Sequence, residues 1–369
     1  MQWSVVSVAV MFLALSVLPS GGSAAASDPS SFLFVVSPSA SDIAVIDSGT
    51  DAVVSRIRLS ALPGPVAALD RGAKLLVASG TGHRLTVFDT VTGTVVAEYP
   101  TTVSPTLLEM APDGRTVAVA DPAAGAVELV RPGASAMVVE GLSGLGAMSF
   151  EAGGRLMVAH GSSVALIDGR TGRSGPGLGI MESDGPVTHL AATPGGDLAI
   201  VVQGERGVLS LFDLRTLTRT VRLVLPAPLG RPFPSPDNQF VLIPVDEGRA
   251  LSVLSTWTYR ESGRLPLTAP VSGFGLGVLQ SVFVGLSAVS RSIQTVDLRD
   301  RRNLAVLDLP GMPKAGAPSA DGTKFYVALD DGGRIAVVDL LRPSVIRIVE
   351  TDIGGPVAVV PALDSGFCH

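Results

Sequence analysis

Four histidines, His83, His160, His189 and His369, carry much of the chemistry that this chain offers. An imidazole serves as a general base near neutral pH and is a common metal ligand. A metal site needs converging ligands at fixed spacing, such as H-x-x-x-H or C-x-x-C, and the sequence contains neither pattern. We therefore predict no metal site. A C-x-x-C-H motif is missing too, which excludes covalent attachment of a c-type haem.

The single cysteine, Cys368, stands between Phe367 and His369. A thiol beside an imidazole is able to bind copper or zinc, or to pair with a thiol of another chain. An exposed cysteine near a chain end more often has no role. One cysteine cannot form an intrachain disulfide, so the hydrophobic core alone must hold the fold.

The composition favours many short strands. The chain has 369 residues, of which 46% are apolar and 16% charged, with a formal net charge of −6. Its 42 glycines and 27 prolines suit tight turns and disfavour long helices. An acidic chain with few lysines lacks a basic stripe that would neutralise phosphates, which argues against nucleic-acid binding.

The N-terminal residues 1–26 read as a signal peptide. Val5–Leu18 is an uninterrupted apolar stretch, and the small residues Ser23–Ala26 follow it. Because no Lys or Arg precedes the stretch, an uncleaved anchor is the alternative, although 14 residues are few for a bilayer crossing. A second uncharged stretch, Leu265–Ser290, contains too many Gly and Pro residues for a lipid-spanning helix and is expected to form buried strands. We predict a soluble mature protein in the periplasm or outside the cell, with no membrane span.

An internal repeat organises the rest of the chain. Apolar segments ending in Asp recur at Asp47, Asp89, Asp168, Asp213, Asp297 and Asp339, with degenerate copies ending at Arg131 and Ser255. Successive ends are 42, 42, 37, 45, 42, 42 and 42 residues apart. Turn sequences such as Pro112-Asp113-Gly114 and Ala320-Asp321-Gly322 recur in step. Each Asp precedes turn residues, so we expect it to cap a turn through its own backbone rather than to bind a metal.

Four short apolar segments per unit predict one blade of a β-propeller. The sequence thus predicts an all-β propeller of four-stranded antiparallel blades spanning residues 27–367, followed by a tail at 368–369. Its units begin near residues 32, 74, 116, 156, 198, 240, 282 and 324, which gives eight blades. Seven remain possible if unit three or six is incomplete. In this register Val357–Val360 would complete the blade that Phe32–Val36 begins.

The repeat, seen in segments such as DIAVIDSGTDAVV and RLTVFDTVTGTVV, followed by APDGRTVAVAD, resembles the YVTN family of bacterial β-propellers. The resemblance covers residues 32 to about 363. It departs from the family pattern in units three and six, which lose the Asp, and in the Y-V-T-N tetrapeptide itself. The family includes surface-layer proteins and quinoprotein-associated subunits, so the resemblance implies the architecture far more strongly than any function.

Candidate ligand-binding residues gather on one face of the predicted ring. His83 and His160 fall in loops between second and third strands, and His189 follows a loop between blades. Those loops share a face in this fold, so three histidines are expected to border the same mouth. Arg231 and Lys314 lead into innermost strands, where they would meet an anionic ligand. The alternative for all five is a solvated rim.

Three functions fit the sequence. The first is an exported, non-enzymatic propeller that binds a partner protein or a small ligand on this face. The second is a redox-associated scaffold or cofactor carrier, resembling quinoprotein dehydrogenase subunits or haem-binding propellers. Quinone-binding propellers stack the cofactor on Trp, and Trp257 is the single Trp after residue 26, which argues against a quinone. The third is a lactonase-like hydrolase with Arg231, His189 and Glu182 as its candidates. No catalytic constellation is recognisable, so we lean towards a non-enzyme, and the sequence leaves the cofactor unknown.

Overall fold

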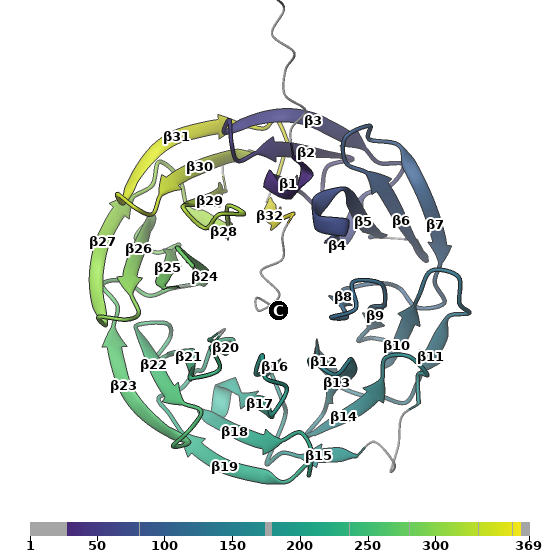
Figure 1. The fold of residues 1–369 in the computed structure, drawn as a ribbon, viewed down its shortest axis with the longest axis vertical. Coiled ribbons are helices and arrows are strands. Elements are labelled where there is room, and N and C mark those ends of the chain that lie inside the picture. Colours follow the sequence, from purple (N-terminus) through teal and green to yellow (C-terminus); the bar gives the residue numbers. More distant parts are fainter. Residues whose placement is uncertain are drawn as a thin grey trace, which may run out of the picture.

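A computed structural model describes residues 28–362, except 81, 174–178, 236, 280, 331 and 356. It shows eight four-stranded antiparallel sheets arranged as blades around a central axis (Figure 1). The predicted fold class is confirmed. Eight blades rather than seven form because the degenerate units three and six also contribute to complete four-stranded sheets. Residues 1–26, which the sequence predicts to be a signal peptide, and the tail residues Cys368 and His369 lie outside the described residues.

The strands occupy four concentric positions in the ring. The innermost strands are β4 (Pro63–Leu69), β8 (Leu107–Met110), β12 (Leu145–Phe150), β16 (His189–Ala192), β20 (Phe233–Pro234), β24 (Gly273–Gly277), β28 (Pro313–Pro318) and β32 (Ala358–Pro361). The second strands are β1 (Phe32–Val36), β5 (Lys74–Ser79), β9 (Val117–Asp121), β13 (Arg155–His160), β17 (Leu198–Gln203), β21 (Phe240–Val245), β25 (Val282–Ser287) and β29 (Lys324–Leu329).

The outer two positions complete each blade. The third strands are β2 (Asp42–Asp47), β6 (Arg84–Asp89), β10 (Ala126–Val130), β14 (Ser163–Asp168), β18 (Val208–Asp213), β22 (Ala250–Ser255), β26 (Ser292–Asp297) and β30 (Arg334–Asp339). The rim strands are β3 (Ala52–Arg58), β7 (Val95–Pro100), β11 (Met137–Val139), β15 (Ile180–Glu182), β19 (Arg219–Val224), β23 (Arg260–Pro266), β27 (Arg302–Asp308) and β31 (Ser344–Glu350). Blade 1 contains β1–β3, and blades 2–8 follow in chain order. We call the face where the innermost strands begin the upper face and the opposite one the lower face.

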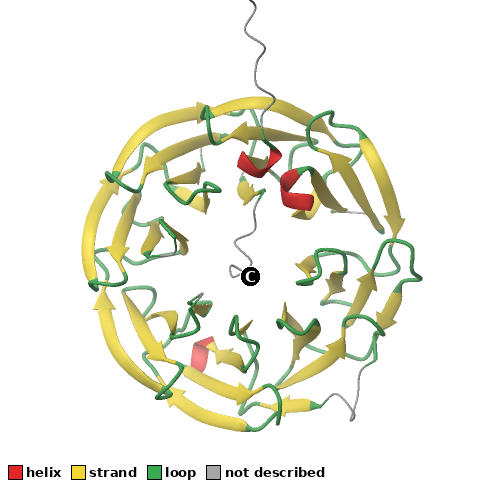
Figure 2. Ribbon diagram, in the orientation of Figure 1, coloured by secondary structure: helices red, strands yellow, loops and turns green. Residues whose placement is uncertain are grey.

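Helical structure in the described residues is limited to three single turns, η1 (Pro29–Ser31), η2 (Asp70–Gly72) and η3 (Gly204–Arg206) (Figure 2). No helix in that part of the chain has the length and apolar character needed to cross a membrane. The uncharged stretch Leu265–Ser290 forms β24 and β25 and the ends of neighbouring elements. The six residues of β25 are all buried, as the sequence predicted.

Burial explains the continuous apolar runs of the repeat. Second and third strands pack against neighbouring blades on both faces, so β1 buries all five of its residues and β17 all six. Rim strands have one face in solvent and therefore alternate, as in β19 with its pattern of exposed and half-buried residues. The core is divided into clusters that each join adjacent blades, for example β5–β6 with β9–β10.

The recurring aspartates cap turns, as predicted. Asp89 Oδ1 accepts hydrogen bonds from the N–H groups of Val91 and Thr92, at 3.1 and 2.8 Å. Asp168, Asp213, Asp297 and Asp339 each accept the same pair of backbone bonds. The hydrogen bond from Thr92 is the main cause that lowers the pKa of Asp89. These carboxylates therefore have a structural role in the turn between the third strand and the rim strand.

The ring closes by pairing the two ends of the propeller. β32 pairs antiparallel with β1, from Leu33 opposite Pro361 to Val36 opposite Ala358 (Figure 1). The first blade thus takes its innermost strand from the last strand of the chain, which confirms the closure expected from the repeat register. No disulfide is available to assist, so this strand pairing and the packing around it must hold the ring.

Side chains also cross the seam between blades 8 and 1. Lys324 Nζ donates to both carboxylate oxygens of Asp51, at 2.9 and 2.8 Å, and to the Ser48 carbonyl at 2.9 Å. The Tyr326 hydroxyl donates to the same carboxylate. Tyr326 is fully buried, and burial together with Asp51 raises its pKa. This Lys–Asp–Tyr network fills and neutralises the seam.

Removing β32 tests the strand closure. A chain that ends at Asp352 leaves the edge of β1 unpaired and uncovers the apolar side chains around Phe34 and Val36. We expect it to lose the cooperative thermal transition of the full chain and to expose hydrophobic surface. Circular dichroism melting measures this, and a truncated chain that melts like the full one would contradict the closure.

Replacing Asp51 tests the side-chain network. Asp51→Ala removes the carboxylate from the half-buried Lys324 and the buried Tyr326 hydroxyl and leaves both with the Ser48 carbonyl alone, so we expect a loss of about 2–3 kcal/mol in the free energy of unfolding. Urea denaturation measures the loss. Arg58→Ala is the matched control, because the Arg58 side chain is 90% exposed and its ion pair with Asp42 is long, at 3.7 Å. This substitution should change the free energy of unfolding by less than about 0.5 kcal/mol.

Candidate functional site

A cavity of about 660 Å³ lies inside the ring, and we call it the channel cavity. Its walls come from the innermost strands of seven blades together with the residues that lead into them. The contributing strands are β4, β8, β16, β20, β24, β28 and β32. A volume of this size is typical of small-molecule and cofactor sites, which span roughly 300–1,000 Å³.

The channel wall consists mostly of apolar side chains and backbone groups. Val66, Leu108, Met110, Phe233 and Val359 contribute apolar side chains. An innermost strand has a sheet neighbour on one side only, so the N–H and C=O groups of its other edge are available to a ligand in the channel. Such a surface combines hydrophobic contact with many weak polar contacts.

Two glycines in the wall have a packing role. A Cβ on Gly275 or Gly316 would lie 2.7 or 2.4 Å from the ring of Phe325, which packs behind both strands. A larger residue at either position would displace Phe325 from the core of blade 8. These glycines let two innermost strands sit against an aromatic core side chain.

His189 is the first residue of β16 and is half-buried in the channel wall. Its Nδ1 lies 2.9 Å from the Thr188 hydroxyl. That hydroxyl also accepts from the Gly204 N–H at 2.9 Å and lies 3.1 Å from the Val202 carbonyl. Thr188 is therefore fixed on three sides and holds the imidazole in one orientation through Nδ1.

Arg231 lies beside His189 on the same wall. The two residues are 42 positions apart, so they occupy corresponding places in blades 5 and 6. Gly230 fixes the approach to Arg231, because its N–H donates to the Pro244 carbonyl at 2.8 Å and a Cβ there would meet the Pro244 ring. Burial, and secondly the charge of Arg231, lower the pKa of His189. At neutral pH the wall thus presents one permanent cation beside a neutral imidazole.

An aromatic cluster continues the wall from this pair. Phe274 stacks on Phe283 with ring centres 5.4 Å apart and meets the edge of Phe233 at 5.7 Å. Phe233 and Phe274 both line the channel cavity. Since aromatic rings in this geometry support each other, Phe233 and Phe274 form a fixed aromatic patch on the wall that Arg231 also lines.

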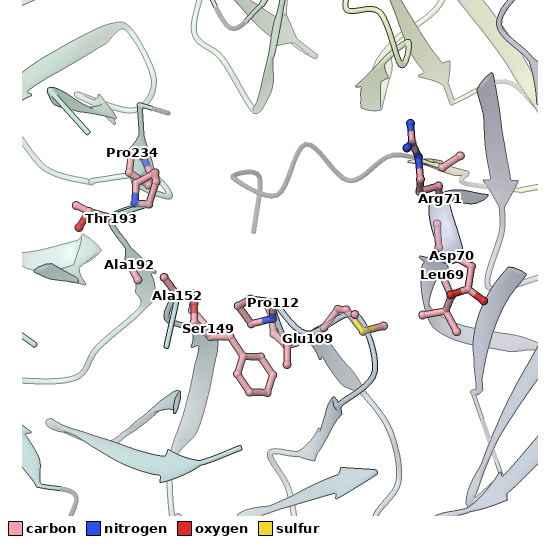
Figure 3. Close-up of a pocket in the computed structure, with 17 residues that line it drawn as sticks. Leu69, Asp70, Arg71, Glu109, Pro112, Ser149, Ala152, Ala192, Thr193 and Pro234 are labelled. Carbon is pink, nitrogen blue, oxygen red and sulfur yellow. Dashed lines mark hydrogen bonds between the residues drawn. The ribbon is translucent and has the colours of Figure 1, made fainter. Parts of the chain in front are cut away.

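A second cavity of about 460 Å³ opens at the lower face and shares Ala68 and Met110 with the first. Figure 3 shows Arg71 on one side of this opening and Thr193 and Pro234 across it. Asp70 and Arg71 both have left-handed backbones, with φ of 48° and 55°, which places Arg71 at the rim. Residues in this conformation often mark functional positions.

The other candidates of the sequence analysis lie elsewhere. His83 is exposed in the turn between β5 and β6, and His160 ends β13 half-buried; neither lines the channel cavity. Lys314 is exposed on β28, with Nζ 3.6 Å from the Met312 sulfur. The structure therefore brings together His189 and Arg231 and leaves the remaining three apart.

The hydrolase constellation is not assembled. Glu182 belongs to the rim strand β15 and accepts a hydrogen bond from Ser163 at 2.9 Å, whereas His189 and Arg231 line the channel. The expectation that Glu182 joins those two residues is wrong, because three sheet positions separate the rim from the channel. Trp257 is 78% exposed on a turn. No cluster of three His, Cys, Asp or Glu suited to a metal occurs in the described part of the chain.

Sequence reasoning missed several wall residues. No sequence motif singles out Phe233 or Phe274, and Thr188 gives no signal beyond its place before His189. The signal for pairing His189 with Arg231 was present, since their spacing equals the repeat period.

The chain is an eight-bladed β-propeller. No protein-family model matches it, and no curated protein does. Among solved structures it is similar to one titled dihydro-heme d1 dehydrogenase NirN in complex with DHE, with a TM-score of 0.73 and 15% identity over 94% of this chain and 78% of that one. It is also similar to Kuenenia stuttgartiensis hydrazine synthase, with a TM-score of 0.56 and 15% identity over 75% and 95% of the two chains.

A third similar structure is a protein of unknown function from Desulfotomaculum acetoxidans, with a TM-score of 0.59 and 13% identity over 76% and 96% of the chains. At these identities the likeness shows a shared fold. The YVTN resemblance stays a prediction.

The lowered pKa of His189 predicts a pH-dependent stability. Above pH 6.5 the His189 imidazole is neutral in both the folded and the unfolded chain. As the pH is lowered below 6.5, the unfolded chain binds the proton first, so the free energy of unfolding decreases. The loss levels off once the pH is below the lowered pKa. Between pH 7 and pH 5, His189→Gln should lose less melting temperature than the parent. His83→Gln, a control at an exposed histidine, should lose as much as the parent. Equal pH profiles for His189→Gln and the parent would contradict the assigned environment.

Proposed function

We propose that this protein is a non-enzymatic carrier that binds a flat, anionic redox cofactor of the tetrapyrrole class in its channel cavity. The observation that carries the proposal is the pair His189 and Arg231 on one wall of a cavity of about 660 Å³. A cavity of that size inside an eight-bladed ring is wide enough for a planar molecule, and its wall is largely apolar.

The residues fit such a group in three respects. Thr188 orients the His189 ring through Nδ1, which leaves Nε2 as the nitrogen available to a ligand. Arg231 offers a permanent, exposed guanidinium for a carboxylate. Phe233 and Phe274 supply a rigid aromatic surface for a ring system. When bound, a haem-type cofactor would supply electron-transfer chemistry; His189 would hold it through its free ring nitrogen and Arg231 would neutralise its carboxylate.

The comparisons support the same class. A propeller with this fold is described as a dihydro-heme d1 dehydrogenase in complex with DHE, and this chain aligns with it over 94% of its length. The sequence adds an expected exported location, from the apolar segment Val5–Leu18. An exported carrier would deliver its cofactor to, or share it with, a partner protein of a redox system outside the cytoplasm.

Titration with haemin tests the proposal. We expect the purified chain to shift and sharpen the Soret band with saturation at one equivalent. His189→Ala should lose the spectrum of a histidine-ligated iron, and Arg231→Gln should raise the dissociation constant about tenfold while keeping the ligation.

His160→Ala serves as the matched control, because His160 is a half-buried histidine outside the channel cavity. It should bind haemin as the parent does. Failure of the parent to bind haemin, or an unchanged spectrum in His189→Ala, would overturn the assignment.

A further inference from the structure

A third cavity, of about 550 Å³, lies between blades 2 and 3 and opens on the lower face; we call it the seam groove. Its floor is apolar, formed by the buried side chains of Leu76 and Val87 of blade 2 and Val117 and Val130 of blade 3. Its polar rim consists of Lys74, Tyr99, Arg115 and Arg131, with Asp70 as its acid.

The closed seam between blades 8 and 1 shows what a filled groove looks like. Lys74 starts β5 opposite Asp89, as Lys324 starts β29 opposite Asp339, so the two lysines are equivalent. Leu76 therefore corresponds to Tyr326, whose buried ring occupies the seam beside blade 1. Blade 2 has a leucine at the position where blade 8 has a phenol ring.

The acid of the closed seam is also missing. Asp47 and Arg131 are 84 residues apart, two repeats, but the turn that follows Arg131 is shorter than the turn that holds Asp51, and its residues 132–135 include no acid. Lys74 has no carboxylate across the seam and instead binds Asp70 of its own blade at 2.6 Å. The degenerate third repeat thus replaces an acidic turn by a basic one.

Cations consequently accumulate at the rim. Arg131 is only 3.9 Å from Asp113, a loose pair. The guanidinium of Arg115 is exposed and makes no ion pair within 4 Å among the described residues. Of the three cations that line the groove, Lys74 pairs with Asp70 and Arg131 pairs loosely with Asp113, so the guanidinium of Arg115 is the positive charge in excess.

We propose that the seam groove binds a small aromatic carboxylate. The aromatic ring takes the volume that Tyr326 fills in the closed seam, and the carboxylate takes the place of Asp51, where it meets Lys74, Arg115 and Arg131. Guanidiniums suit this role because they bind carboxylates through paired hydrogen bonds. The site is separate from the channel and does not depend on the cofactor proposed there.

Calorimetry with 4-hydroxyphenylacetate as the probe tests the site. We expect saturable binding at one site and no binding of the neutral 4-hydroxyphenylacetamide. Arg131→Gln should weaken binding about tenfold. Arg58→Gln, a substitution of a fully exposed arginine on blade 1, should leave it unchanged.

A substitution that fills the groove with a side chain of the protein tests the site independently. Leu76→Tyr should abolish probe binding and raise the melting temperature, whereas Leu76→Met, which conserves volume, should keep both near the parent values. No saturable binding at millimolar probe, or binding that survives both Arg131→Gln and Leu76→Tyr, would overturn the proposal. If Leu76→Tyr fails to fold, the Arg131→Gln and amide results decide alone.

The two proposed sites can fail separately. His189→Ala should bind 4-hydroxyphenylacetate like the parent, and Arg131→Gln should bind haemin like the parent. Loss of probe binding in His189→Ala would place the probe in the channel and overturn the seam groove as its site.

Discussion

Ring closure is the constraint on which the rest of this structure depends. A four-stranded blade cannot cover its own two faces, so each must pack between two neighbours, and the first and last blades must find each other. Here β32 supplies the innermost strand of blade 1, and the side chains of Lys324, Asp51 and Tyr326 join the same seam. With no disulfide possible in the chain, the stability of every other seam relies on this one remaining shut.

The channel follows from closure. Eight twisted sheets packed face to face cannot reach the axis, so the innermost strands surround a space with their backbone edges and with side chains that mostly point into the blades. Polar side chains reach the channel chiefly from residues that begin or precede an innermost strand. His189 and Arg231 are such residues, one repeat apart. Two such residues one 42-residue repeat apart in the sequence therefore lie on neighbouring blades and face the same channel.

The periodicity predicted nearly all of the architecture, because each unit is a local object whose strands and turns are encoded by its own residues. Blade number, capping aspartates and strand closure all followed from it. The site followed only in part. His189 and Arg231 could be placed by their spacing. Lys314 is not a whole number of repeats from Arg231 and lies at an irregularity in the pairing of β28 with β29, and Glu182 lies three sheet positions from the channel. Asp70 and Arg71 both adopt left-handed backbones, which aspartate tolerates but which the arginine residue type does not predict. Such details arise from packing across blades.

Internal repetition offers a way to recognise function inside such a fold. Each seam faces the same packing problem, so a seam that solves it with buried side chains is a reference for one that does not. The seam of blades 8 and 1 uses a phenol ring, a carboxylate and a lysine, whereas that of blades 2 and 3 retains the lysine and loses the other two. A loss of packing alone would leave an apolar gap. The arginine at position 131, where most repeats have an aspartate, instead adds a guanidinium that pairs only loosely with Asp113, and Arg115 of the same rim makes no ion pair among the described residues. These guanidiniums above an apolar floor, more than the void alone, are the reason to assign this seam an anionic aromatic ligand.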